Sequence, residues 1–428
     1  MTTPPLRPTL GLASRKAATA ALEAHVQVLK GTPMRRAISE TLFKAEKLGG
    51  KERRFVAYAT RELSRHLRRL ELSAKTRGWP SSKLHLPEDQ ALLRYALWRH
   101  ELCGAPVDKI MTEVGLPGPI RPRGIPDQLI RGELEKRVEL DFGATPIDQA
   151  ASRQSFPNWL AERIAEVAPE GELEAIFEAL NREPFLTFRT RPEGTRDELM
   201  AALAKSGIEV EASAQTTDTL RVSNESRAIF ESRWLKEGRL QVMDLGSQLL
   251  AGLCQVKPGM VAVDYCAGAG GKTIALADAV GPTGRVYAWD NSPKRLQEAK
   301  RRVQELKLRH VTFPTPVRID LADVVLIDAP CSGTGTLSRE PDQKWKLTWQ
   351  KVEALVQTQL EILATVAPQV KPGGVIVYGT CSLLQAENEA VVDAFLARTK
   401  GWSRGEQLRV WPHRIDGGGF FGARLLKS

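Results

Sequence analysis

Apolar residues recur at spacings of three and four along the first third of the chain, and this pattern predicts amphipathic helices. Clusters of glycine and proline interrupt the pattern, as at Gly31-Thr32-Pro33, Gly49-Gly50 and Leu116–Pro126, and they mark the expected ends of helices. We therefore expect an all-helical domain over residues 1–140. Its helices are predicted at Ala17–Leu29, Met34–Lys47, Lys51–Leu72, Glu88–Leu102 and Pro126–Val138.

The pattern changes twice further along the chain. Residues 150–240 mix helices with short strands at Phe185–Thr190 and Thr219–Val222, which predicts a small α+β module. Over residues 241–428, hydrophobic strands alternate with long helical segments, which is typical of a mainly parallel, doubly wound, Rossmann-like α/β sheet. The strands of that sheet are predicted at Met260–Tyr265, Arg285–Asp290, Asp323–Asp328 and Gly373–Gly379.

The net charge of +10 over 428 residues is unevenly distributed. Residues 1–140 hold 26 Lys and Arg against 15 Asp and Glu, whereas the remainder holds 35 against 36. A basic domain attached to a neutral body indicates a polyanionic partner, and nucleic acid is the commonest; a merely solvated basic surface is the alternative. The spacing predicts one basic stripe on the exposed face of a helix over Lys51–Arg69. Its members are Arg54, Arg61, Arg65, Arg68 and Arg69.

The apolar runs and the cysteines of the chain indicate where in the cell the protein is expected. No apolar run approaches the roughly 20 residues that cross a bilayer, and Met1–Leu10 has neither the pattern of a signal peptide nor that of an anchor. The five cysteines are scattered, odd in number and lack a C-x-x-C pair, so neither a disulfide framework nor a zinc site is expected. We expect a cytoplasmic protein, monomeric, with reduced thiols, no metal and no membrane partner.

A glycine-rich turn follows the first strand of the predicted sheet, in the sequence V-D-Y-C-A-G-A-G-G-K-T at Val263–Thr273. Open α/β sheets bind ligands at the carboxyl ends of their strands, and the helix after the turn offers free N–H donors. A phosphate-binding P-loop is excluded because it requires glycine where Cys266 stands. Asp290 ends the next strand, where an acid contacts ribose hydroxyls in such folds, although capping the helix after Ser292-Pro293 explains it equally well. Turn and acid together indicate a nucleoside-bearing cofactor, either a dinucleotide or S-adenosylmethionine.

Two cysteines each follow a predicted strand at its carboxyl end. Cys331 lies in D-A-P-C-S-G-T-G at Asp328–Gly335, and Cys381 lies in T-C-S at Thr380–Ser382. If the two strands are neighbours, both thiols face the crevice that contains the glycine turn. A single intracellular cysteine is more often core filler, but two at strand exits beside polar turns favour reactive thiols.

These motifs, in this order, resemble those of the RNA (cytosine-5)-methyltransferases of the RsmB/Sun branch. The resemblance runs from about residue 241 to 427 and includes Arg339–Asp342 with Lys344-Trp345, Glu387–Glu389 and Gly419–Phe421. Earlier stretches, Phe156-Pro157-x-Trp159 and Asn181-Arg182-x-Pro184, look like the small α+β module of that branch, and the basic helical region resembles its NusB-like RNA-binding domain. That organisation implies 16S-type ribosomal RNA as the substrate, with transfer RNA as an alternative.

The resemblance implies S-adenosylmethionine as cofactor and assigns roles residue by residue. Cys381 would add to carbon 6 of cytosine, which makes carbon 5 nucleophilic, and Cys331 would act in the release step. Asp328 would hydrogen-bond the cytosine edge, with Lys272 supporting the electrostatics. Asp244 with Ser247 and Gln248 resembles a further family motif, although a helix cap explains it as well. The expected catalytic residues are Cys381, Cys331, Asp328 and Lys272, and the expected cofactor contacts are Cys266, Ala267, Gly268, Ala269, Gly270, Gly271, Lys272, Asp290 and Asp328.

The chain departs from the family pattern at two places. Ala269 replaces the usual proline of the cofactor loop. The usual acid near the cofactor adenine is missing from Val311–Pro314, and Asp320 is only a weak substitute. This second departure keeps open a rival of another class, a non-catalytic RNA-binding assembly factor with a methyltransferase fold.

Overall fold

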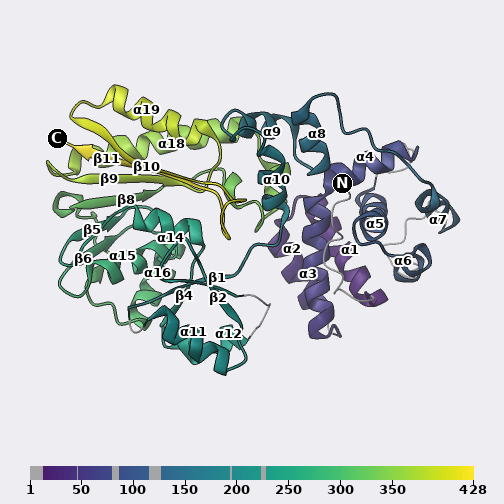
Figure 1. Cartoon of the computed structure of the whole chain (residues 1–428), viewed down its shortest axis with the longest axis horizontal. Coiled ribbons are helices and arrows are strands. Elements are labelled where there is room, and N and C mark those ends of the chain that lie inside the picture. The colour runs from purple at the N-terminus through teal and green to yellow at the C-terminus, as the bar shows by residue number, and fades with distance from the viewer. Residues whose placement is uncertain (1–12, 46, 80–85, 115–126, 193–194, 223–227) are drawn as a thin grey trace. The chain divides into compact units, whose positions relative to one another are not determined.

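The structure is a computed structural model that describes residues 13–45, 47–79, 86–114, 127–192, 195–222 and 228–428 (Figure 1). The chain start at Met1–Leu10 and the predicted break at Leu116–Pro126 lie outside the described residues. Two compact units make up the chain. The first comprises residues 1–177 together with Glu340–Lys346, and the second comprises Glu178–Arg339 and Leu347–Ser428.

Helices build the first unit, as predicted. The predicted helix over Lys51–Leu72 is two helices, because the chain turns at His66. The helices are α1 (Arg15–Leu29), α2 (Met34–Lys44), α3 (Gly50–Arg65), α4 (Leu67–Thr76), α5 (Pro87–Leu97) with a π-helical turn at Trp98–Leu102, α6 (Val107–Val114), α7 (Asp127–Glu135), α8 (Pro146–Arg153), α9 (Asn158–Ala165) and α17 (Gln343–Lys346), while α10 (Leu173–Asn181) runs from the first unit into the second.

Trp98 stands at the centre of the core of this unit and is fully buried. Its ring lies among those of Phe55, Tyr58 and Tyr95, with centroids 5.7 to 6.2 Å away. The alanines of α1 complete the same core, since their small side chains let neighbouring helices approach closely. The hydroxyl of Ser14 accepts a hydrogen bond from the N–H of Ala17 and so caps the start of α1.

The predicted arginine stripe over Lys51–Arg69 is wrong in placing all five side chains on one exposed helix face, although Arg54 is exposed. Arg65 is fully buried and pairs with Glu62, one turn earlier on α3. Arg68, on the next helix, points its guanidinium at the backbone and donates to the carbonyl of Phe156 over 2.6 Å. A buried carboxylate at the right spacing makes burial of a guanidinium tolerable, and spacing alone did not reveal it.

The short helix α17 joins this unit from the later part of the chain. The buried ammonium of Lys344 donates to the carbonyl of Arg65 over 2.8 Å and lies 4.2 Å from the ring centroid of Phe156. Burial, together with the charge of Arg65, holds the pKa of Lys344 well below its ordinary value. The indole N–H of Trp345 donates to the carbonyl of Ser64 over 2.7 Å. The helical unit is therefore completed by residues that follow the Cys331 loop in sequence.

Two sheets build the second unit. The smaller is antiparallel with strand order β2-β3-β1-β4, and α11 packs on it through the buried Phe188, Leu199, Leu203 and Leu220. This is the predicted α+β module. Its elements are β1 (Thr187–Thr190), α11 (Arg196–Lys205), β2 (Val210–Ala212), β3 (Thr219–Val222), α12 (Ala228–Glu231), α13 (Arg233–Lys236) and β4 (Leu240–Val242).

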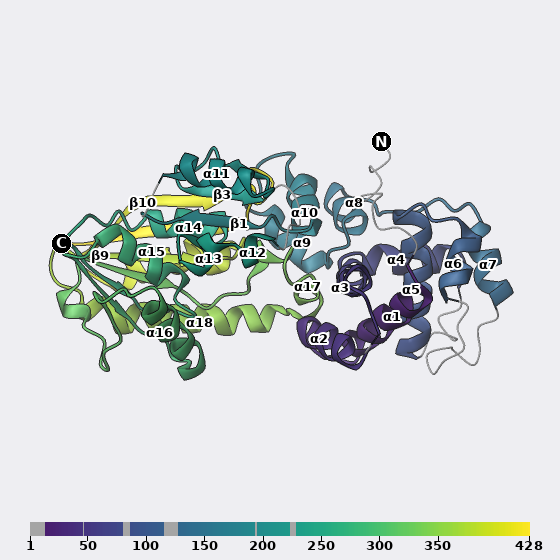
Figure 2. The ribbon, with the colours of Figure 1, turned by 90° about the horizontal axis from the view of Figure 1, so that it is seen from below.

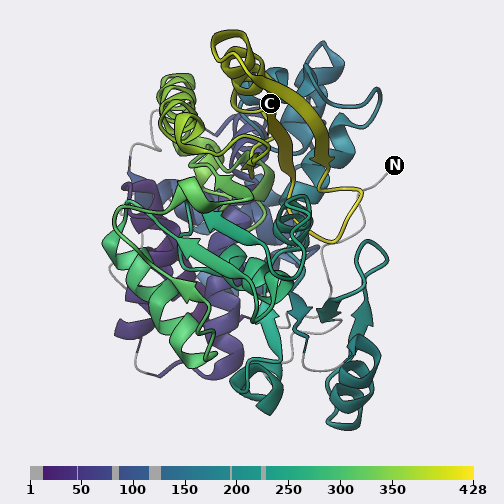
Figure 3. The ribbon, with the colours of Figure 1, turned by 90° about the vertical axis from the view of Figure 1, so that its left-hand side faces the viewer.

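The larger sheet has strand order β10-β11-β9-β8-β5-β6-β7. Its strands from β9 to β7 are parallel, as predicted, and β11 and β10 extend it in antiparallel fashion at one edge (Figure 3). The elements are α14 (Leu245–Gly252), β5 (Val261–Asp264), α15 (Gly271–Val280), β6 (Arg285–Ala288), α16 (Pro293–Glu305), β7 (Val311–Thr312), β8 (Val324–Asp328), α18 (Trp349–Val366), β9 (Val375–Thr380), α19 (Glu389–Arg398), β10 (Trp402–Val410) and β11 (Phe420–Lys427).

Helices cover both faces of this sheet (Figures 1 and 2). Along β8, Val325 and Ile327 face the cluster that includes α18 and α19, whereas Val324 and Leu326 face the cluster that includes α15 and α16. Because both faces of β8 are buried, its residues Val324–Ile327 are all apolar. This continuous apolar run is why the strand could be predicted from the sequence. In the part of the chain that the structure describes, no helix combines the length and the apolar character needed to cross a membrane.

A buried ion triad ties the smaller sheet to α15. Arg189 and Arg191 of β1 both bind the carboxylate of Asp278, and all three side chains are less than a tenth exposed. Gln241 of β4 adds a hydrogen bond of 2.7 Å to the carbonyl of Gly271, in the first turn of α15. The α+β module is thus anchored to the helix that follows the glycine turn.

Removal of this anchor is expected to destabilise the protein strongly. Asp278→Ala leaves two buried guanidinium groups without their carboxylate and should lower the free energy of unfolding by about 3–5 kcal/mol in urea titrations followed by circular dichroism. Asp393→Ala, which breaks the exposed pair with Arg404, should cost less than about 1 kcal/mol. Equal costs for the two variants would contradict a structural role for the triad.

Candidate active site

The glycine turn between β5 and α15 is tightly bent. Gly268 and Gly270 both have left-handed backbones, with φ of 54° and 82°. A Cβ on Gly268 would lie 2.3 Å from the guanidinium of Arg295, and one on Gly270 would lie 3.0 Å from Ala299. The left-handed backbone therefore favours glycine at both positions, and the turn lies against α16 with the first N–H groups of α15 beside it.

Asp290 joins this turn to the next strand. Its carboxylate accepts hydrogen bonds from the N–H of Gly268 (2.7 Å) and of Ser292 (2.8 Å), and the residue is 7% exposed. The sequence allowed two roles for Asp290, a ribose contact or a cap at the start of the next helix. In the structure, Asp290 accepts a hydrogen bond from Ser292 at the start of α16 and also lies at the glycine turn. A buried carboxylate one strand from a glycine turn fits the ribose of a nucleoside-bearing cofactor.

The remaining turn residues line the same strand exit. Ala267 is buried and donates from its N–H to the carbonyl of Trp289 over 2.9 Å. Cys266 is half-buried, and burial raises the pKa of its thiol. Ala269, in place of the usual proline, is exposed, and its carbonyl accepts a hydrogen bond of 2.8 Å from Arg302.

The two predicted cysteines meet at the carboxyl ends of β8 and β9. These strands are parallel neighbours, with Asp328 in register with Gly379. The Sγ atoms of Cys331 and Cys381 lie 3.4 Å apart. Gly335 closes the loop after Cys331, because its N–H donates to the carbonyl of Cys381 over 2.9 Å and a Cβ there would come within 2.1 Å of a backbone oxygen.

The surroundings of the two thiols shift their pKa values in opposite directions. A hydrogen bond from the thiol of Cys331 lowers the pKa of Cys381, and Lys272 and the hydroxyl of Thr336 lower it further, against the opposing effects of burial and Asp328. The same hydrogen bond, with burial, raises the pKa of Cys331 well above its ordinary value. Burial also raises the pKa values of the thiols of Cys103, Cys254 and Cys266. Cys381 is thus the cysteine set up to ionise, as a nucleophile requires.

Lys272 and Asp328 form an ion pair beside the cysteines, with Nζ and Oδ2 2.7 Å apart. Burial lowers the pKa of Lys272, but the Asp328 carboxylate outweighs this effect and the net shift is upward. Lys272 is therefore a permanent cation in the first turn of α15, and its ammonium also lies 5.7 Å from the ring centroid of Phe420. The pair places one positive and one negative charge between the glycine turn and the thiols.

Two acids important to this arrangement were not assigned a role from the sequence. Glu387 is fully buried and accepts hydrogen bonds from the N–H of Ser332 (2.8 Å) and the hydroxyl of Ser382 (2.6 Å), so it joins the two cysteine loops. Asp264 ends β5, and its carboxylate accepts a hydrogen bond of 2.7 Å from the hydroxyl of Thr273. Burial raises the pKa of Asp264 to about 7. Each stands in a quoted motif, but only the fold shows what it contacts.

The motif at Asp244 acts as a helix cap. Its carboxylate accepts from the N–H of Gly246 at the start of α14 and from the N–H of Gly418. Gln248 accepts a hydrogen bond from Thr219, in the α+β module. Asp320 lies on the surface and pairs with Arg318. Among the described residues, no group of three or more His, Cys, Asp or Glu side chains is arranged to hold a metal ion.

Comparison with known proteins agrees with this geometry. A family model described as 16S rRNA methyltransferase RsmB/F matches residues 252–426, and a ferredoxin-like domain of RsmF/B-like methyltransferases matches residues 156–228. "Probable ribosomal RNA small subunit methyltransferase B" of Synechocystis sp. is 33% identical over 299 residues, which cover 64% of this chain and 67% of that protein. "Ribosomal RNA small subunit methyltransferase B" of Yersinia pestis is 31% identical, with coverage of 72% and 73%.

Solved structures share the fold. PH0851 superimposes with a TM-score of 0.76 at 24% identity, covering 96% of this chain and 99% of its own. NSun6 from Pyrococcus horikoshii, solved with SFG, gives a TM-score of 0.56 at 20% identity, with coverage of 64% and 98%. The sheet, the glycine turn and the paired cysteines define an S-adenosylmethionine-dependent RNA methyltransferase. The chain belongs to the 16S rRNA methyltransferase RsmB/F family.

The geometry of Asp290 leads to a direct test of cofactor binding. Asp290→Ala removes two hydrogen bonds that hold the glycine turn, and it should raise the Kd for S-adenosylmethionine by roughly tenfold or more in calorimetry. Asp320→Ala, at the exposed acid, should change this Kd by less than about twofold. A larger effect at Asp320 would mean that this residue replaces the missing adenine-side acid.

Proposed function

We propose that this protein transfers a methyl group from S-adenosylmethionine to carbon 5 of a cytosine in small-subunit ribosomal RNA, with Cys381 as covalent nucleophile. The carrying observation is the contact of 3.4 Å between Cys331 and Cys381, in which only Cys381 has a lowered pKa. Membership of the RsmB/F family supports the choice of substrate. We place the enzyme in the cytoplasm and expect it to act as a monomer.

In this mechanism the Cys381 thiolate adds to carbon 6 of the cytosine, and the electrons of the 5,6 double bond move so that carbon 5 becomes nucleophilic. Carbon 5 then forms a bond to the methyl group while the bond between that methyl group and the sulfonium sulfur of the cofactor breaks, which leaves S-adenosylhomocysteine. A base in the site next takes the proton from carbon 5, the 5,6 double bond re-forms, and Cys381 leaves as a thiolate. Cys331 lies within hydrogen-bond distance of Cys381 and is assigned to this release step.

The surrounding charges support each stage. Asp328 ends β8 beside the thiols and is assigned to the cytosine edge, where it would stabilise charge that develops in the adduct. Lys272 holds this carboxylate in place and keeps a positive charge near the Cys381 sulfur. Residues 266–272 and Asp290 are assigned to the cofactor, because the left-handed Gly268 and Gly270 bend the turn tightly at the start of α15 and the Asp290 carboxylate is bonded to this turn.

The other parts of the chain are assigned to the RNA. We propose that residues 1–140 form a NusB-like RNA-binding domain, that residues 150–240 form a module contacting the substrate, and that residues 241–428 form the catalytic domain. A stacked or paired cytosine must be extruded before Cys381 can reach carbon 6, so these parts have to hold the RNA by its backbone. If S-adenosylmethionine does not bind, the rival function of a non-catalytic assembly factor is favoured instead.

Loss of the nucleophile should abolish the reaction. Cys381→Ala is expected to reduce methyl transfer to small-subunit rRNA by roughly 1,000-fold or more, measured as radiolabel transferred from the cofactor. Cys103→Ala, in the helical unit, serves as the matched control and should keep wild-type activity. Full activity of Cys381→Ala would refute the assignment.

Loss of the release group should trap the intermediate. Cys331→Ser is expected to accumulate a covalent protein–RNA adduct, visible as a band of reduced mobility in denaturing gels. The double variant Cys331→Ser/Cys381→Ala should give no such band, since it lacks the sulfur that forms the bond. A folded Cys331→Ser variant that turns over normally without an adduct would assign the release step to another group.

A further inference from the structure

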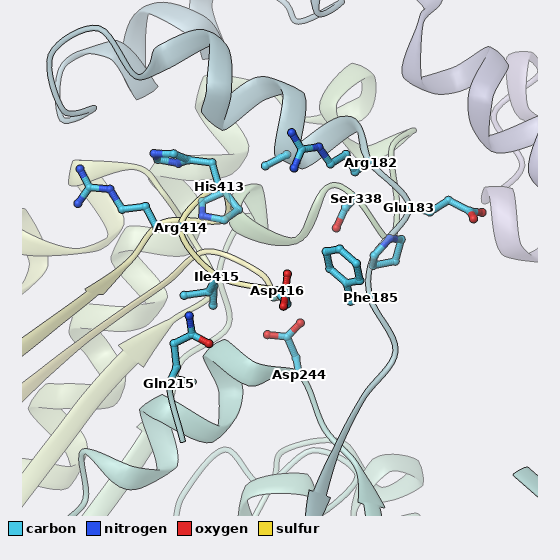
Figure 4. Close-up of a pocket in the computed structure, with 14 residues that line it drawn as sticks. Arg182, Glu183, Phe185, Gln215, Asp244, Ser338, His413, Arg414, Ile415 and Asp416 are labelled. Carbon is cyan, nitrogen blue, oxygen red and sulfur yellow. The ribbon is translucent and has the colours of Figure 1, made fainter. Parts of the chain in front are cut away.

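A cavity of about 190 Å³ lies in the second unit, outside the residues assigned to the chemistry (Figure 4). Three segments that are far apart in sequence form most of its walls: the end of α10 with the residues that follow it, the loop between β2 and β3, and the loop between β10 and β11; Asp244 and Ser338 complete the lining. The side chains that matter here are those of Arg182, Phe185, Gln215, His413, Arg414 and Asp416. A pocket of this size accepts a single base and is smaller than the roughly 300 Å³ at which drug-sized ligand sites begin.

One wall of the cavity is connected to the nucleophile. The loop between β10 and β11 continues into Gly419, whose N–H donates to the carbonyl of Gly335 over 2.8 Å. Gly335 in turn donates to the carbonyl of Cys381. Gly418 packs so closely on Thr336 that a Cβ would approach its methyl group to 2.8 Å. Two backbone hydrogen bonds therefore lead from the cavity wall to the catalytic cysteine.

An exposed aromatic ring stands in the cavity. Phe185 is 37% exposed, and the guanidinium of Arg221 lies 4.7 Å from its ring centroid. Single-stranded RNA is bound mainly through bases that stack on aromatic rings and guanidinium planes, and such stacking tolerates any base. Gln215, on the opposite wall, adds an amide that can donate to or accept from a base edge.

The charges of the cavity suit a polyanion at its rim. The two carboxylates that face it are already paired: Asp416 with Arg221 over 3.0 Å, and Asp244 with Arg339. Glu183 points away from the other side chains (Figure 4). Arg182 pairs with Glu178, in a half-exposed contact of 2.9 Å that contributes little stability and can be exchanged for a phosphate.

We propose that this cavity binds one nucleotide of the RNA that neighbours the target cytosine, with its base stacked on Phe185 and its phosphate held by Arg182. The inference rests on the proposed function and extends it, because it assigns a second base-binding position next to the one that reacts. The extruded cytosine and its neighbour would then occupy two sites that share the loop between β10 and β11. Such a pair of sites would fix the direction in which the strand crosses the active site.

The test compares two exposed aromatics of the same module. Phe185→Ala should raise the Kd for an in vitro transcript of 16S rRNA roughly 5- to 100-fold in filter binding at fixed salt. Phe230→Ala removes a ring that is 48% exposed but does not line the cavity, and it should change this Kd less than about twofold. Neither variant should alter the Kd for S-adenosylmethionine. Phe185→Leu keeps the apolar bulk without the ring and replaces Phe185→Ala if that variant fails to fold.

A second arm identifies the contact. Transcripts with an abasic site at each position around the methylated cytosine are bound to wild type and to Phe185→Ala. At one position, the missing base should raise the Kd of the wild-type protein for the RNA. The same missing base should leave the Kd of Phe185→Ala unchanged, because this variant has already lost the contact. Equal binding of Phe185→Ala and wild type, or a uniform loss at every position, would overturn the proposal. Because binding is measured without methyl transfer, an inactive wild type that binds RNA normally would refute the proposed reaction and not this subsite.

Discussion

The parallel pairing of β8 with β9 is the constraint on which the active site depends. In-register pairing of Asp328 with Gly379 brings the ends of both strands to the same level, so that the loops carrying Cys331 and Cys381 start side by side. Gly379 has no side chain, and this lets α14 pack directly on β9. A Cβ at this position would lie 2.5 Å from the side chain of Leu250. A shift of one residue in the register would turn each side chain to the opposite face of the sheet and separate the thiols.

Buried polar groups then hold the two loops in contact. Glu387 accepts from the residue after each cysteine, Ser332 and Ser382, so one carboxylate controls the geometry of both loops. Lys272 and Asp328 add a fixed pair of charges, with the cation favouring the Cys381 thiolate. Because these groups are satisfied before any substrate arrives, the site does not have to reorganise when charge develops during the reaction.

Much of this site could be predicted from the sequence, and the remainder could not for identifiable reasons. The strands β5, β6 and β8, which end at Asp264, Ala288 and Asp328, were predictable because strands buried on both faces are continuously apolar. The burial of Arg65 was missed, since spacing on one helix does not reveal a turn at His66 or the pairing with Glu62. The role of Glu387 depends on contacts across 55 residues of sequence, with Ser332, which no local pattern contains. The strands β10 and β11 were not predicted either, because their pairing with β9 is likewise a long-range feature.

The placement of α17 affects how the chain can be dissected. The backbone passes between the two units three times, after Phe177, after Arg339 and after Lys346, so no single cut separates them. A fragment that starts at residue 141 would lack the carbonyls of Ser64 and Arg65, which hold Trp345 and Lys344. The lysine would then lose its acceptor and its enclosure, only a few residues beyond the Cys331 loop. Loss of activity in such a truncation would therefore not distinguish damage around the Cys331 loop from loss of a function of the helices, and point substitutions in the helices separate the two.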